Sequence, residues 1–169
     1  KLDKGHTPEV YIARIRVGPK RGDGSSPELT DWRQYSTLAQ IVGEFAAIEP
    51  KSEVGKQMKT EAPGIIRPLA KAFAEADPAT EGKRMMAGPD ALQAFARFKT
   101  DDLGEVLRTA LKNKDVQMRA TAAGLIADVP PTDENIDSLN EAFDYAWKND
   151  VESNDAILAT LDALFKLDK

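Results

Sequence analysis

Two consecutive helical patterns occupy residues 100–131, which read TDDLGEVLRTALKNKDVQMRATAAGLIADVPP. Thr100 opens the first pattern as a capping residue, and two acidic residues follow it, where the positive end of a helix favours carboxylates. Apolar residues then recur at helical spacing, which predicts one buried face; they are Leu103, Val106, Leu107, Ala110 and Leu111. Asp115 caps the second pattern, which ends at the proline pair 130–131 because proline cannot continue a helix. We therefore expect two antiparallel helices joined by a short turn.

The same pairing recurs along the chain, which is typical of a repeat architecture. Residues 31–45 align with residues 115–129 without a gap and with three identical positions. The Asp-Val pair at 150–151 also aligns with the Asp-Val pair at 115–116, at an offset of 35. We predict a single all-α domain over residues 1–169, with about four antiparallel helix pairs at about residues 7–48, 62–98, 101–129 and 132–167.

Three places depart from the regular pattern. Residues 19–30 are rich in glycine, serine and proline, so we expect a flexible loop between the helices of the first pair. Residues 49–61 are polar and rich in lysine, with room for one short helix around Glu53–Lys59. Gly88-Pro89 should kink or restart the second helix of the second pair.

The composition favours a folded, soluble helical protein. Hydrophobic residues make up 41% of the 169 residues and charged residues 30%, while aromatic residues reach only 7%. The chain has no cysteine, which excludes disulfides and thiolate metal sites but leaves both a cytoplasmic and a periplasmic location open. No apolar run approaches the ~20 residues of a membrane helix, so we expect no membrane partner.

The segment from Leu111 to Leu125 resembles the inter-helix turn and second helix of a HEAT repeat, in the armadillo-like class of helical repeats. The matching residues are Asn113 and Asp115 in the turn, Met118 as the aliphatic residue, Arg119 as the arginine, and Ala122 and Ala123 as the closely packed alanines. The resemblance implies a right-handed α-α superhelix, a solenoid whose second helices line a concave protein-binding face. It also implies that Arg119 bonds the turn of its own or a neighbouring repeat. The fourth pair has Asn154 where the arginine is expected.

No constellation of catalytic, cofactor-binding or metal-binding residues stands out. His6 is the only histidine, and we interpret it as an ordinary surface residue. The chain has no phosphate-binding glycine loop, and we expect no cofactor. The acidic pairs at 101–102 and 133–134 lie in first helical turns, so we interpret them as helix-start residues and not as an acid–base pair.

The acidic charge of the last third of the chain argues against a nucleic-acid partner. Residues 101–169 carry seven basic and fifteen acidic side chains, a net charge of −8 that opposes a phosphate backbone. Basic residues gather elsewhere, and they are Arg14, Arg16, Lys20 and Arg21, followed by Lys51, Lys56 and Lys59. The candidate partner-binding residues are instead aromatic, because tyrosine and tryptophan commonly anchor interfaces, although packing between repeats is an open alternative; they are Trp32, Tyr35, Tyr145 and Trp147.

The leading hypothesis is a non-catalytic protein–protein interaction scaffold with a protein or peptide partner. One alternative is a helical accessory region of a larger, bacterial enzyme such as a peptidyl-prolyl isomerase. Another is a nucleic-acid-binding helical repeat. The last predicted helix is apolar on several sides and has no stop signal before Lys169. We therefore expect a piece of a longer protein, in which a further repeat or domain contacts this end.

Overall fold

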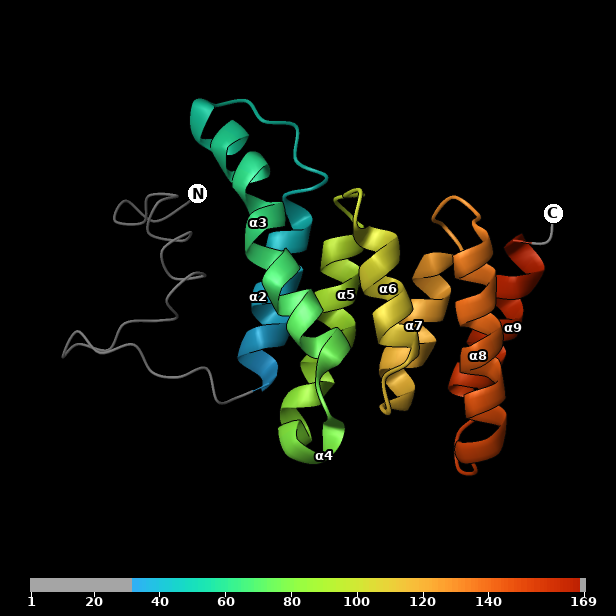
Figure 1. Cartoon of the computed structure of the whole chain (residues 1–169). Helices are drawn as coiled ribbons and strands as arrows, with labels where there is room; N and C mark the ends of the chain where they lie inside the picture. Colours follow the sequence, from blue (N-terminus) through green and yellow to red (C-terminus); the bar gives the residue numbers. More distant parts are fainter. Residues whose placement is uncertain (1–31, 168–169) are drawn as a thin grey trace.

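The computed structural model describes residues 32–167, and each element in that range is a helix (Figure 1). In chain order these are α2 (Trp32–Glu44), α3 (Glu53–Glu75), α4 (Pro78–Glu81), the 3-10 helix η1 (Gly82–Ala87), α5 (Gly88–Ala96), α6 (Leu103–Leu111), α7 (Val116–Ile126), α8 (Asp133–Asn149) and α9 (Asp155–Leu167). The all-helical prediction is confirmed for this part of the chain. The expected first helix, the loop at 19–30 and His6 lie outside the described residues.

The helices form two layers, which run in chain order from one end of the described region to the other (Figure 1). In one layer α3 contacts α6, and α6 contacts α8; in the other, α2, α5, α7 and α9 contact one another in sequence. Across the layers, α3 packs on α5, α6 on α7 and α8 on α9. Each pair is therefore in contact with its neighbours in both layers.

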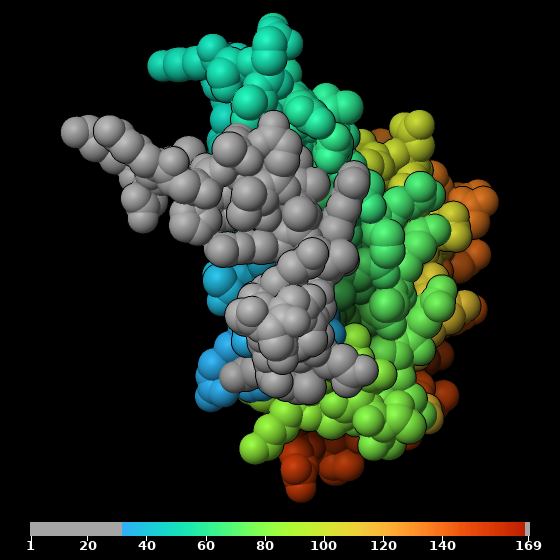
Figure 2. All heavy atoms as spheres, turned by 90° about the vertical axis from the view of Figure 1, so that its left-hand side faces the viewer, coloured from blue at the N-terminus to red at the C-terminus, as the bar shows by residue number. Residues whose placement is uncertain are grey.

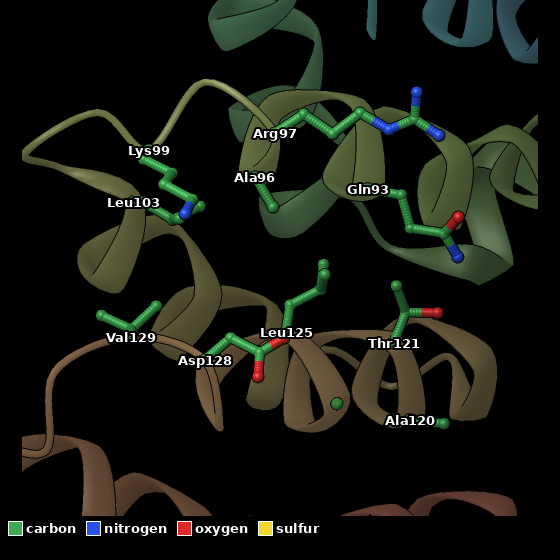
Figure 3. A pocket seen from close by; sticks show the side chains of 11 residues that line it. Gln93, Ala96, Arg97, Lys99, Leu103, Ala120, Thr121, Leu125, Asp128 and Val129 are labelled. Atoms are coloured by element: carbon green, nitrogen blue, oxygen red, sulfur yellow. The ribbon is translucent and has the colours of Figure 1, made fainter. Parts of the chain in front are cut away.

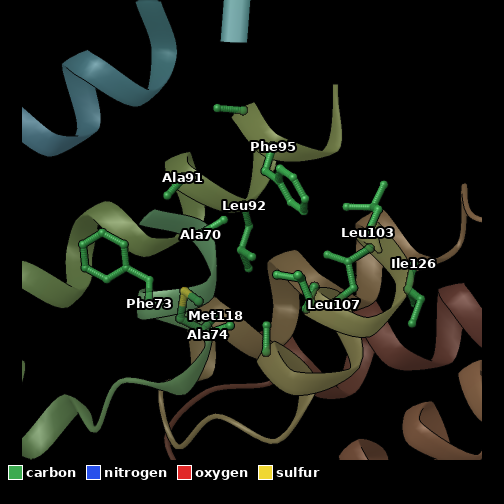
Figure 4. Packing of buried hydrophobic residues seen from close by; sticks show 14 of the residues in the cluster. Ala70, Phe73, Ala74, Ala91, Leu92, Phe95, Leu103, Leu107, Met118 and Ile126 are labelled. Atoms are coloured by element: carbon green, nitrogen blue, oxygen red, sulfur yellow. The ribbon is translucent and has the colours of Figure 1, made fainter. Parts of the chain in front are cut away.

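The core lies between the layers and is built around α5, α6 and α7 (Figure 4). Phe95, Leu107 and Met118 are fully buried, as are Ala122 and Ala123. Small residues are needed where helices approach closely: a Cβ added to Gly43 of α2 would lie 3.1 Å from the Cα of Ala94 in α5. The predicted close packing of the two alanines of α7 is confirmed.

Helix α3 begins at Glu53, nine residues before the predicted start of its pair at residue 62. The short helix expected around Glu53–Lys59 is present, but it is the beginning of α3 and not a separate element. Ser52 caps α3 by accepting a hydrogen bond from the backbone N–H of Gly55 at 3.1 Å, and the helix continues through Pro63 and Pro68. The buried residues of α3 begin only at Ala62, and its first turns project beyond the other helices (Figure 2). The exposure of these first turns to solvent explains their polar sequence. Pro63 resembles a residue of the first helical turn, but it lies inside α3.

One predicted cap and one predicted alignment also differ from the structure. Thr100 does not cap α6; its hydroxyl donates to Asp102 at 3.0 Å, and the helix starts at Leu103. Helix α9 starts at Asp155, and Val151 lies in the preceding turn, 94% exposed. The offset of 35 residues between the two Asp-Val pairs therefore does not relate equivalent positions. The predicted cap Asp115 is confirmed, Thr132 caps α8, and the predicted break at Gly88-Pro89 is the start of α5.

We predict that Ala123→Leu will lower the free energy of unfolding by roughly 1–3 kcal/mol, because the fully buried site has no room for three more carbons. Urea denaturation followed by circular dichroism measures this. Ala72→Leu on the exposed side of α3 is the matched control and should change stability little. Equal midpoints for both variants would contradict the packing of α7.

Candidate protein-binding surfaces

The turn between α6 and α7 is bonded to the helix pair before it. Asn113 is buried, and its amide nitrogen donates to the carbonyls of Phe73, Ala74 and Ala76 at 3.2, 3.1 and 2.8 Å. These carbonyls lie at the end of α3, where backbone acceptors lack helical partners. The side-chain oxygen of Asn113 accepts from the backbone N–H of Asp115 at 2.8 Å. One asparagine therefore closes its own turn and terminates the neighbouring helix.

Arg119 bonds the same turn to the helix pair after it. Its side chain is fully buried in α7; one terminal nitrogen donates to the carbonyl of Asn113 at 2.7 Å, and the other pairs with the carboxylate of Asp150. The guanidinium also lies over the ring of Tyr145, 4.7 Å from its centroid. The structure thus brings Arg119 to the Asn113 turn, while Asp115 instead accepts from the N–H of Met118 at 2.9 Å.

Ion pairs reinforce contacts along these layers. Lys114 lies 2.9 Å from Asp77, across the turns, and the N–H of Ala79 together with Lys114 lowers the pKa of Asp77 below its usual value. Arg67 of α3 donates to Asp102 at 2.7 Å. Burial alone would raise the pKa of Asp102, but hydrogen bonds from Thr100 and Arg67 outweigh it and lower the pKa. These carboxylates are therefore ionised and engaged in joining helices.

The four candidate aromatic residues have different environments. Trp32 and Tyr35 are half-buried against the core, and the ring of Tyr35 meets that of Phe73 edge-on at 6.1 Å. Tyr145 is 40% exposed and covers Arg119. Trp147 is 71% exposed and stacks on Phe143. Of the four, Trp147 is the one whose side chain is mostly available to a partner.

A groove between α5 and α7, which the sequence reasoning missed, opens on the surface with a volume of about 760 Å³ (Figure 3). Its lining is mainly small and aliphatic, and the residues are Ala96, Leu103, Ala120, Gly124, Leu125 and Val129. A Cβ on Gly124 would meet no atom within 4 Å, so the floor is open there. The signal in the sequence was the stripe Ala120, Thr121 and Gly124 on α7, but its meaning depends on where α5 lies.

Polar side chains surround this apolar floor. Gln93, Lys99, Thr121 and Asp128 line the groove, and none makes a side-chain hydrogen bond or ion pair within residues 32–167. Lys99 lies three residues after the last residue of α5 and has a φ of 50°, a left-handed conformation that is uncommon outside glycine. The groove therefore offers the cation of Lys99, two neutral polar groups and the carboxylate of Asp128, which interacts electrostatically with Lys166 of α9.

Other chemistry finds no support in the described helices. No group of three or more potential metal-ligating side chains occurs there, and none of these helices is both long and apolar enough to cross a membrane. Lys56 pairs with Glu53, and Lys59 donates to the carbonyl of Ile48, so two lysines of the proposed basic set are engaged locally. The arginine-rich part of that set, and Ser25-Ser26, lie outside the described range.

Comparisons with protein-family models, curated proteins and solved structures find no match to this chain. Its function is therefore inferred from the geometry of these surfaces.

We predict that Arg119→Ala will lower the free energy of unfolding by about 3–5 kcal/mol, because it leaves the largely buried carboxylate of Asp150 without its partner. Arg97→Ala is the control: it removes an exposed ion pair with Glu44 and should cost only ~0–1 kcal/mol. Arg108 is unsuitable as a control because it is half-buried and donates to Asn135 at 2.8 Å. Denaturant titration measures the stability of both variants. Equal small losses in their free energy of unfolding would contradict a structural role for Arg119.

Proposed function

We propose that this chain is a non-catalytic protein-binding scaffold of the HEAT-like type, and that the groove between α5 and α7 binds a peptide segment of its partner. The observation that carries the proposal is the open apolar floor surrounded by polar side chains, among them Gln93, Lys99 and Thr121. Protein surfaces that bind peptides combine apolar area for affinity with a few polar groups that fix orientation.

The arrangement of the helices supports the same class of protein. Solenoid repeats contact only their neighbours, as the three successive pairs do here, and a right-handed superhelix would place α2, α5, α7 and α9 along one binding face. The arginine that bonds successive turns agrees with the HEAT resemblance. The groove then lies between two consecutive inner helices.

One carboxylate of each acidic pair, and the carboxylate of Asp115, have structural tasks. Asp102 accepts from Arg67, and Asp115 caps α7. Glu134 lies in the first turn of α8, where a backbone N–H and the Thr132 hydroxyl lower its pKa. Carboxylates held ionised at helix starts are poor proton donors at neutral pH. These contacts favour binding over acid–base catalysis.

The charges of the groove indicate the kind of peptide. Lys99 lies on the α5 side, and Asp128 lies at the end of α7 on the other side. Arg97 contributes less, because it already pairs with Glu44. We infer a segment with small or aliphatic side chains at its centre, an acidic residue facing Lys99 and a basic residue facing Asp128.

We predict that Gly124→Leu will abolish binding of peptides selected on the unmodified chain from a displayed random-peptide library. The new side chain fills the groove without meeting any atom within 4 Å at its Cβ, and replacing a helical glycine should raise helix stability by roughly 0.5–1 kcal/mol. Gly64→Leu is the matched control, since Gly64 is an equally open helical glycine on α3. Peptides that bind both variants equally, or tight binding of nucleic acid at physiological salt, would contradict the proposal.

A further inference from the structure

The end of the described region at α8 and α9 exposes large apolar side chains. Trp147, Leu158 and Leu161 are 71%, 63% and 47% exposed. Monomeric proteins seldom leave a contiguous apolar patch of this kind uncovered, and such patches commonly mark interaction sites. The end face is defined by six residues: Ile136, Phe143, Trp147, Leu158, Leu161 and Leu164.

Helical spacing places these residues on one surface. Ile136, Phe143 and Trp147 are separated by seven and four positions and share a side of α8, while Leu158 and Leu161 are neighbours three positions apart on α9. Leu164, which is half-buried, borders that pair of leucines. A surface hollow of about 660 Å³ is lined by Ile136 and Asn140 of α8 and by Leu161 and Leu164 of α9, so the two stripes meet. The end face is therefore continuous across both helices.

The packing between pairs indicates what covers such a face. Helices α8 and α9 cover α6 and α7 with their other sides, on which the buried residues are Leu139, Ala142, Ala146, Ala156, Thr160 and Ala163. Most of these are small, and the helices approach closely as a result. The end face occupies the position from which a further helix would continue the same packing, so its occupant is expected to be helical, with small and aliphatic residues in the contact stripe.

Charge distinguishes between possible occupants. Residues 133–167 carry nine acidic and two basic side chains, a net charge of −7. Asp137 and Asp144 are exposed next to the apolar stripe of α8, and neither makes an ion pair within the described helices. A second copy would bring like charges together across the interface, which is unfavourable. A helix with lysine or arginine on its flanks would complement them.

We propose that the end face binds an amphipathic helix of a partner protein, with a contact stripe of small and aliphatic residues and with basic flanks. The site is separate from the groove between α5 and α7 and does not depend on the function proposed for it.

Trp147 provides a direct readout. The chain has two tryptophans, so a Trp32→Phe background isolates the emission of Trp147. The probes are two synthetic helices of about 20 residues with the same alanine–leucine stripe, one with lysine flanks and one with glutamate flanks. We expect a saturable blue shift with the lysine peptide, and binding weaker by at least about tenfold with the glutamate peptide or at high salt.

Matched variants localise the site. Leu161→Asp should abolish the shift, and Leu158→Asp is a second variant at a more exposed position should the first unfold, as judged by circular dichroism. Ile41→Asp on α2, a position as exposed as Leu161, should leave binding unchanged, as should Gly124→Leu in the groove. The proposal is overturned by equal binding of both peptides, by no saturable shift, or by a dimer in sedimentation equilibrium that Leu161→Asp dissociates, which would make a second copy the occupant.

Discussion

The arrangement of the helix pairs depends on a buried cation. Placing the Arg119 guanidinium in the protein interior removes its hydration, a cost of several kcal/mol unless close partners replace the water. The carbonyl of Asn113, the carboxylate of Asp150 and the ring of Tyr145 supply that replacement, while the Nε atom is left without a hydrogen-bond acceptor. Because the partners belong to two consecutive helix pairs, the charge is satisfied only when those pairs lie side by side. The cost of burial is therefore a constraint on the spacing of the pairs.

Asn113 extends the constraint in the other direction, since its amide is satisfied only against the carbonyls at the end of α3. The turns of three successive pairs are thus fixed at one edge of the two layers. In the layer of α3, α6 and α8, the bonds from Arg67 to Asp102 and from Arg108 to Asn135 join the same neighbours. A groove between α5 and α7 needs a stable separation of those helices, and these edge contacts supply it without filling the groove itself.

Sequence periodicity predicted the helices of the last two pairs, apart from the cap of α6, because their apolar stripes, the caps Asp115 and Thr132 and the two prolines are all local signals. It failed at α3, where Pro63 resembles a helix start and where exposed turns have the polar composition of a loop. The Asp-Val pair at 150–151 was a misleading match, because Asp150 serves as the acceptor for Arg119 and not as a helix cap. The groove could not be predicted at all: Gly124 and Ala96 belong to helices more than twenty residues apart, and only their packing side by side makes a surface of them.

Within the described residues, α8 and α9 pack against other helices on one side only, so the pair must be held in place by contacts on that side. Helices α8 and α9 meet this requirement with an inner side made of small residues, which lets α9 pack closely on α7, and with the bond from Arg119 to Asp150 in the turn between them. The pair is therefore attached through its inner side and its turn, and Trp147, Leu158 and Leu161 take no part in that attachment. Their outward apolar character is not needed to hold the pair in place. A partner bound to the outer side of α8 and α9 would add contacts to a pair that is already anchored. The pair therefore does not have to fold upon binding.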